Sequence, residues 1–255
     1  EDQVGGSVNI GVPSLMTQPW NPVSGSNWVY DMMPIRGVGD MAVVYDPYTG
    51  LFRPMRLESA DVFVQEGLPV GKTLDWVNLE FVEENVVPDD AWVDWDPEAQ
   101  VFLTAGDVYT ETETAKAKVV MTYPADFPGA LQWHDGSTFS LADMVFSVAL
   151  YFDRAQEESA VFDPAAVGDF TAFQQAFKGW RIASEDPIVI EYYTDAYGLD
   201  AENNVSNFRA MYPTTDGMYA QGQGGWHNMA AAWLAESDGE LAFSDSKAGE
   251  LEVEY

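Results

Sequence analysis

Residues 131–154, LQWHDGSTFSLADMVFSVALYFDR, give the clearest local structure signal in the chain. A short extended run ends at Trp133, and His134-Asp135-Gly136 predicts a tight reversal because Gly136 can adopt a positive φ. Ser140 is then placed to cap a helix, and Asp143 lies three residues on as the acidic partner of a short-armed capping box. The segment therefore predicts a strand, a turn and a capped helix in immediate succession.

The predicted helix that begins after Ser140 carries one apolar stripe. Apolar residues recur at three- and four-residue spacing, namely Met144, Val145, Val148, Ala149 and Phe152. Such a stripe has to be buried against another part of the protein. The strand, the turn and the helix should therefore fold as one unit.

This combination of turn and capped helix resembles a signature of the extracellular solute-binding proteins of family 5. These are the dipeptide, oligopeptide and nickel receptors of bacterial ABC importers, and their pattern runs like F-H-D-G-x-P-x-T-A-x-D-V-x-F-S. Residues 133–136 and 140–147 match it, whereas Thr138 and Phe139 occupy the stretch where the family usually has proline. In that family the motif is architectural, so the resemblance indicates a scaffold and leaves the ligand open.

The resemblance implies an α/β (mixed α+β) fold, a periplasmic-binding-protein-like type II lobe with mixed β-sheets flanked by helices. Residues 1–40 and 195–255 would form the discontinuous core of lobe I, and residues 41–194 would form its mixed-sheet subdomain. A second lobe would be absent from this chain, which we expect to be the N-terminal part of a receptor. The likeness is strong at 131–154 and weak elsewhere.

Residue patterns along the rest of the chain predict further elements. We expect strands at 8–12, 101–103 and 118–123, and a hairpin that joins 180–184 to 188–194. Helices are expected at 28–38, from Asp163 to 177, at 227–235 and at 244–254, and residues 200–207 read as a polar loop. Residues 64–100 are either an insertion or a strand pair.

The charge of the chain is strongly negative. Eleven Lys and Arg stand against 42 Asp and Glu, a formal net charge of −31, so nucleic acid and anionic membranes are poor partners. Acids concentrate in residues 80–98, which contain no Lys or Arg, and in residues 236–255, where Lys247 is the one basic residue. The favoured interpretation is a solvated acidic surface on an exported protein, and a saline habitat is an alternative.

Other features of the composition bear on location. The chain has no apolar run of about 18 residues, so we expect no direct membrane insertion. The chain begins at Glu1 with no leader or lipid anchor, as a mature exported protein would, but so would any trimmed chain. The family resemblance implies a periplasmic or extracellular, cell-surface-attached location. The absence of cysteine excludes disulfides, thiolate catalysis and zinc–thiolate sites.

Motifs for catalysis or metal binding are weak, and we predict no enzyme, no metal and no cofactor. His134 and Asp135 are adjacent in a turn and point in different directions, so a turn-stabilising role is favoured over an acid–base dyad. Residues 94–98 mimic the start of a calcium loop, but Ala99 and Ala105 replace the required Gly and Glu. The glycine-rich residues 221–225 lack the lysine of a phosphate loop.

Aromatic residues near polar loops are the better candidates for ligand contact. Loops that follow a strand of an open α/β sheet commonly line the ligand crevice, and flat rings there can cover a peptide or a sugar. The candidates, from two parts of the chain, are Trp20, Asn21, Asn27, Trp28, Tyr30, Trp226 and Asn228.

The resemblance implies a receptor lobe that captures a solute, with an oligopeptide favoured, and delivers it to an ABC-transporter permease. The receptor would be a monomer and would perform no covalent chemistry. An oligosaccharide is the alternative ligand on the same scaffold. From a different class, a secreted glycoside hydrolase or carbohydrate-binding β domain would also be acidic and rich in aromatic residues, and a purely structural surface domain is a further alternative.

Overall fold

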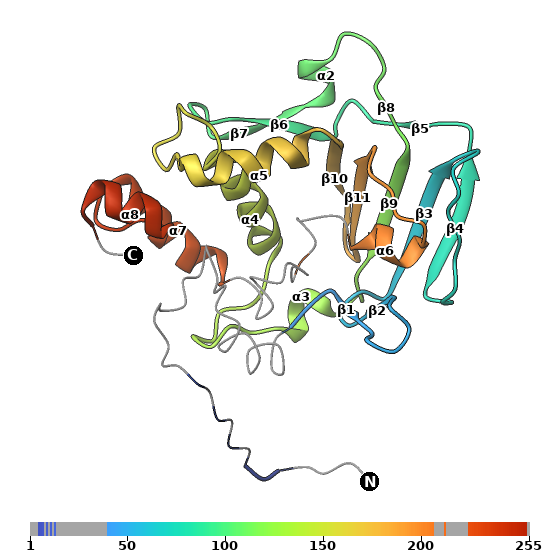
Figure 1. The fold of residues 1–255 in the computed structure, drawn as a ribbon, viewed down its shortest axis with the longest axis horizontal. Helices are drawn as coiled ribbons and strands as arrows, with labels where there is room; N and C mark the ends of the chain where they lie inside the picture. The colour runs from blue at the N-terminus through green and yellow to red at the C-terminus, as the bar shows by residue number, and fades with distance from the viewer. Residues whose placement is uncertain are drawn as a thin grey trace.

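The computed structural model describes residues 40–206 and 224–253, together with Tyr212 and residues 5–7, 9, 11 and 13 (Figure 1). The helices and strands of these residues are, in chain order, β1 (Val43–Tyr45), β2 (Phe52–Pro54), β3 (Ser59–Gln65), β4 (Val77–Val82), β5 (Asn85–Val86), β6 (Trp92–Asp96), β7 (Val101–Thr104), α2 (Ala105–Val108), β8 (Thr114–Ala115), β9 (Ala117–Thr122), α3 (Phe127–Ala130), α4 (Leu141–Asp153), α5 (Pro164–Gln174), β10 (Phe177–Glu185), β11 (Ile188–Thr194), α6 (Ala201–Val205), α7 (Trp226–Ser237) and α8 (Asp245–Leu251).

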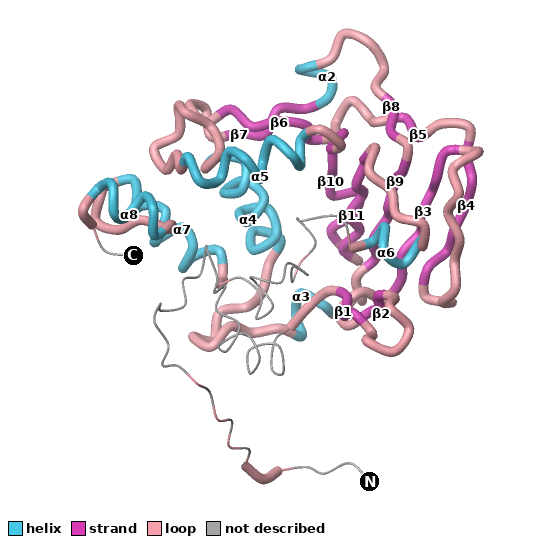
Figure 2. Tube along the Cα trace, viewed as in Figure 1, coloured by secondary structure: helices cyan, strands magenta, loops and turns pink. Residues whose placement is uncertain are grey.

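A seven-stranded sheet forms the centre of the described structure. Its strand order is β4-β3-β9-β11-β10-β6-β7. The pair β3–β4 is parallel, with Ala60 opposite Val77, whereas the other neighbouring pairs are antiparallel. The fold is therefore mixed α+β with a large mixed sheet flanked by helices, as the sequence predicts at this coarser level (Figure 2).

Helices α4, α5 and α6 share one apolar core with the inner face of this sheet. Alternate residues of the strands point into that core, among them Val62, Met121 and Ile190, each no more than 1% exposed. The predicted stripe of α4 meets them, because Met144 and Phe152 are each 1% exposed and Val145 and Ala149 pack against the same cluster. The prediction of a capped helix with one buried face is confirmed.

Helix α5 begins as predicted, since the Asp163 carboxylate accepts a hydrogen bond from the Ala165 N–H at 2.9 Å. It ends earlier than predicted, at Gln174, and Phe177 instead opens strand β10. Phe173 and Phe177 nevertheless stack with ring centroids 4.7 Å apart. The aromatic contact that suggested a longer helix forms across the helix–strand junction.

The predicted hairpin over 180–184 and 188–194 is confirmed as β10–β11, and the strands predicted at 101–103 and 118–123 correspond to β7 and β9. Residues 64–100 form strands β4, β5 and β6. The strand predicted at 8–12 and the helix predicted at 28–38 lie largely or wholly outside the described residues. None of the helices in the described part of the chain has the length and apolar character that a membrane span requires.

The prediction of a polar loop at 200–207 is wrong, because residues 201–205 form helix α6. Polar side chains of this helix bind backbone groups. Asn204 accepts from the Gly198 N–H at 2.6 Å and donates to the Asp200 carbonyl, while the fully buried Glu202 accepts from the Thr73 N–H at 2.8 Å. The bond of Glu202 therefore links α6 to the connection between β3 and β4.

Candidate functional site

The predicted turn at His134-Asp135-Gly136 forms with Gly136 at a φ of 88°. Its backbone closes through hydrogen bonds from the Gly136 N–H to the Trp133 carbonyl at 2.9 Å and from the Trp133 N–H to the Ser137 carbonyl at 2.8 Å. The Asp135 carboxylate accepts from the Ser137 N–H and hydroxyl, which lowers the pKa of Asp135 to about 2. The acid of this turn is therefore ionised at neutral pH.

Asp143 connects the beginnings of two helices. Its carboxylate accepts from the Ser140 N–H at 2.7 Å, which completes the predicted capping box of α4. The other oxygen accepts from the Trp226 N–H at 2.8 Å, at the first residue of α7. The side chain is fully buried, and both bonds are charge-assisted. One carboxylate thus places the first turn of α7 beside the motif turn.

Asp135 pairs with a histidine that is distant in sequence. The His227 Nε2 lies 2.8 Å from the Asp135 carboxylate, and the two side chains are 29% and 52% exposed. His134, its sequence neighbour, is exposed. Of the predicted turn-stabilising pair His134 and Asp135, Asp135 binds Ser137 within the turn, and its histidine partner is His227 of α7.

Gly225 allows α7 to begin close to Trp133. A Cβ at position 225 would lie 2.7 Å from the His227 ring and 3.1 Å from the Trp133 indole, so a larger residue would displace one of them. The Trp133 indole N–H is buried here and has no hydrogen-bond partner among the described residues. Trp133, Gly225 and His227 are therefore tightly packed against one another. The Trp133 indole N–H is the buried donor that has no partner among the described residues.

Two of the predicted ligand-contact residues lie at this junction. Trp226 is 42% exposed, and its ring meets the His227 ring edge to face at 6.0 Å. Asn228 is also exposed, on the same first turn of α7. The other predicted residues, Trp20, Asn21, Asn27, Trp28 and Tyr30, lie outside the described residues. An exposed indole, an amide and a carboxylate–histidine pair can together hold a polar ligand that has a flat or apolar part.

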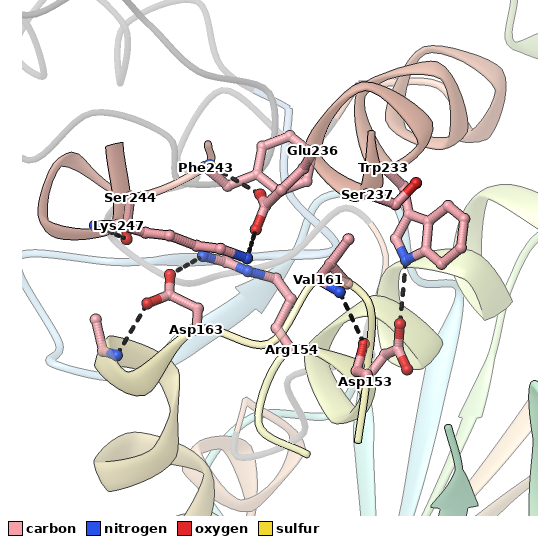
Figure 3. Close-up of polar contacts among 12 residues, drawn as sticks. Asp153, Arg154, Val161, Asp163, Trp233, Glu236, Ser237, Phe243, Ser244 and Lys247 are labelled. Atoms are coloured by element: carbon pink, nitrogen blue, oxygen red, sulfur yellow. Dashed lines mark hydrogen bonds and ion pairs between the residues drawn. The ribbon is translucent and has the colours of Figure 1, made fainter. Parts of the chain in front are cut away.

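Asp153, at the end of α4, also holds α7 in place. This buried carboxylate accepts from the indole N–H groups of Trp95 at 2.9 Å and of Trp233 at 3.0 Å. It therefore joins the β6 strand to the middle of α7. Figure 3 shows the bond to Trp233. The sequence analysis missed this role, and the only available signal was an acid at the C-terminal end of an apolar helix.

Buried ion pairs complete the attachment of α7 and α8, as Figure 3 shows. Arg154 donates to Asp163 at 2.6 Å and lies over the Phe243 ring, 5.5 Å from its centroid. Glu236, fully buried, pairs with Lys247 and accepts from the Phe243 N–H at 2.9 Å. The first pair joins the end of α4 to the start of α5 and contacts the α7–α8 connection through Phe243, and the second pair joins α7 to α8.

A separate hollow of about 260 Å³ lies between α2 with the connection that follows it and the residues after β5. Its lining includes Asp89, Tyr109, Glu111 and Glu113, residues that the sequence analysis did not select. Glu113 is paired with Lys178 at 2.5 Å. Its lining is acidic, and of the predicted ligand-contact residues that the structure describes, Trp226 and Asn228, neither belongs to it.

Groups of three or more potential metal ligands are absent from the described residues. The segment that mimics a calcium loop forms the turn between β6 and β7 instead. There the Asp96 carboxylate accepts from the Glu98 and Ala99 N–H groups, each at 2.9 Å. A carboxylate used in this way stabilises a hairpin turn.

No protein-family model matches the chain, and no curated protein matches it significantly. A function therefore has to be inferred from the junction of the motif turn with α7 and from the motif resemblance described above.

Proposed function

We propose that this chain is the substrate-capturing lobe of an extracellular receptor that serves an ABC importer and resembles the family 5 solute-binding proteins. The favoured ligand is an oligopeptide. The observation that carries the proposal is the motif unit, in which the turn at Gly136 and the capped helix α4 form one folded piece packed on a mixed sheet. This unit joins α7 through Asp143, next to the exposed Trp226 and Asn228.

Capture would follow from closure of two lobes over the ligand, with this chain supplying one wall. The receptor would then present the solute to a membrane permease without covalent chemistry. Trp226 would cover an apolar part of the ligand, and Asn228 would exchange hydrogen bonds with its backbone. The His227–Asp135 pair, at the same turn, would stabilise the position of this surface.

A secreted glycoside hydrolase or carbohydrate-binding β domain is less well supported. A helix packed on a mixed sheet is not expected of a β-dominated sandwich. Such a hydrolase also needs two carboxyl groups that face each other across the glycosidic bond. The buried acids of the described residues, such as Asp143, Asp153 and Glu236, are instead bound to backbone, indole or lysine groups.

Isothermal titration calorimetry of the complete gene product tests the proposal. Oligopeptides of mixed sequence should bind, and linear oligosaccharides of similar length should bind weakly or give no heat. Trp226→Ala should weaken peptide binding, whereas Tyr48→Ala, which removes another exposed aromatic ring that is 97% exposed, should not. Hydrolysis of an oligosaccharide, or binding of neither class of ligand, would contradict the proposal.

A further inference from the structure

Helix α7 presents an apolar stripe that is partly exposed. Trp226, Ala230 and Leu234 follow one another at four-residue spacing and so share a face, with Ala231 beside them. Trp226 is 42% exposed and Leu234 is 56% exposed. Met229 and Glu236 are buried on a neighbouring face of α7, and the helix lies at one edge of the described structure (Figure 1).

Exposed carboxylates lie at both ends of this stripe. Asp135, 52% exposed, contacts His227 at the N-terminal end of α7. Asp238 and Glu240 follow the C-terminal end, and both are exposed. The basic residue of this region, Lys247, is only 12% exposed and is paired with Glu236. The rim of the stripe is therefore negative, within a chain of net charge −31.

We propose that this stripe of α7 binds a short cationic peptide that also carries apolar side chains. The inference rests on the proposed function, because it names the class of peptide that the receptor captures. The stripe runs about 17 Å from His227 to Asp238, a length that an extended peptide of about five residues spans. A single face of α7 can thus contact several side chains of one ligand.

Each feature of the surface fits such a ligand. Leu234 and the two alanines give apolar contact, and the face of an exposed Trp226 indole attracts a lysine or arginine group. Carboxylates at the two ends complement cationic groups along the peptide, and the negative field of the chain raises the rate of encounter with cations. A neutral sugar lacks the positive charge that these carboxylates complement, and an anionic peptide is repelled by them.

Fluorescence anisotropy with the 255-residue chain tests the inference. The probes are a short labelled peptide of alternating lysine and leucine, its counterpart with glutamate in place of lysine, and a neutral labelled oligosaccharide. The lysine peptide should bind at least about tenfold more tightly than either of the others, and added salt should weaken it. Equal binding of the lysine and glutamate peptides would contradict the inference.

Two variants locate the binding on α7. Ala231→Lys adds a positive charge to the exposed face and should weaken the lysine peptide about fivefold while strengthening the glutamate peptide. Leu234→Ser should weaken the lysine peptide by a similar factor, and Tyr48→Ala, at a distant exposed site, should have no effect. Since positions 231 and 234 are both exposed, circular dichroism should show unchanged folding.

The outcomes separate this inference from the proposed function. If the complete receptor binds neutral or acidic peptides and both α7 variants bind as the unaltered protein does, the receptor function stands and the inference is wrong. If no peptide binds to either the chain or the complete receptor, both are wrong.

Discussion

The sheet with its covering helices and the pair α7–α8 are held together by different forces. The sheet core consists of aliphatic and aromatic side chains, and large residues such as Trp180 and Ile190 are fully buried in it. The pair α7–α8 shares a much smaller apolar cluster with α4, which includes Leu150, Met229 and Phe243. Its remaining attachments are carboxylates, since Asp143 and Asp153 bind Trp226 and Trp233 of α7 and Asp163 binds Ser244 before α8. Within the pair, Glu236 of α7 binds Lys247 of α8.

This difference determines how each region responds to the loss of a side chain. A core residue that is truncated loses transfer free energy and leaves a cavity, and the effect spreads through the cooperative sheet. A buried ion-pair partner that is removed leaves the other charge without compensation, so the cost is local to the attachment. The sheet should therefore unfold cooperatively as a whole, whereas α7–α8 should detach while the sheet stays folded.

The largest effect is expected for Phe152→Ala in the sheet core. Phe152 meets the rings of Phe170 at 4.9 Å and Phe177 at 5.6 Å, and it is 1% exposed. Its truncation should lower the free energy of unfolding by about 3–5 kcal/mol, because a cavity forms. Urea unfolding followed by circular dichroism measures this change. Tyr48→Ala is the control, and an equal effect of both substitutions would contradict this assignment.

A smaller and more local effect is expected for Glu236→Ala. The substitution leaves Lys247 and the Phe243 N–H without their acceptor in a buried place, at a cost of about 2–3 kcal/mol. Amide exchange should speed up in α7 and α8 and stay slow in β9 and β11. Asp238→Ala, an exposed acid two residues on, is the matched control. Faster exchange in the sheet as well would remove the distinction between the two regions.

The smallest effect on stability is expected when the pH is lowered. Burial raises the pKa of Asp163, but its bonds to the Ala165 N–H, Ser244 and Arg154 outweigh this, so the pKa lies below its ordinary value of 3.8. A carboxylate whose pKa is lowered by folding contributes stability that is present above its unfolded pKa and lost as the pH falls through the folded value. Attachment of α7–α8 should therefore weaken below about pH 4.

Amide exchange of α7 and α8 across this pH range measures the effect, with Asp163→Asn as the variant that should lack this contribution. The sheet also has such an acid, because the bonds of Glu191 to Lys118, Tyr193 and Arg181 outweigh burial and lower its pKa. The large apolar core of the sheet should nevertheless keep the sheet folded at a pH where the amide hydrogens of α7–α8 have begun to exchange. Loss of protection from amide exchange at the same pH in both regions would contradict the proposed difference between the sheet and α7–α8.

Local patterns were sufficient to predict α4, the turn before it and the hairpin β10–β11. Each depends on residues close in sequence, such as Gly136 for the turn and Asp143 for the cap. Helix α6 was missed because its polar side chains bind backbone groups, and the partner of the buried Glu202, the Thr73 N–H, is distant in sequence. The parallel pairing of β3 with β4 also had no local signal, since it is specified by a neighbouring strand and not by a turn.

The candidate site was less predictable than the fold. The sequence predicts Trp226 and Asn228 as ligand-contact residues. Both are exposed in the structure, and their contact with a ligand stays a prediction. The second hydrogen bond of Asp143, to Trp226, joins residues that no pattern relates. The pairing of Asp135 with His227 had one usable signal, because the chain has only two histidines and one begins a helix. Such long-range polar pairs depend on the tertiary fold.

The position of β9 in the sheet has a consequence for biosynthesis. This strand lies between β3, which comes long before it in the chain, and β11, which comes long after it. On the ribosome, β3 and β9 can pair early, but the far side of β9 has to wait until Thr194 has emerged. During that interval a half-formed sheet exposes an unpaired edge, so translation speed and chaperone binding between residues 123 and 188 should influence the yield of folded protein.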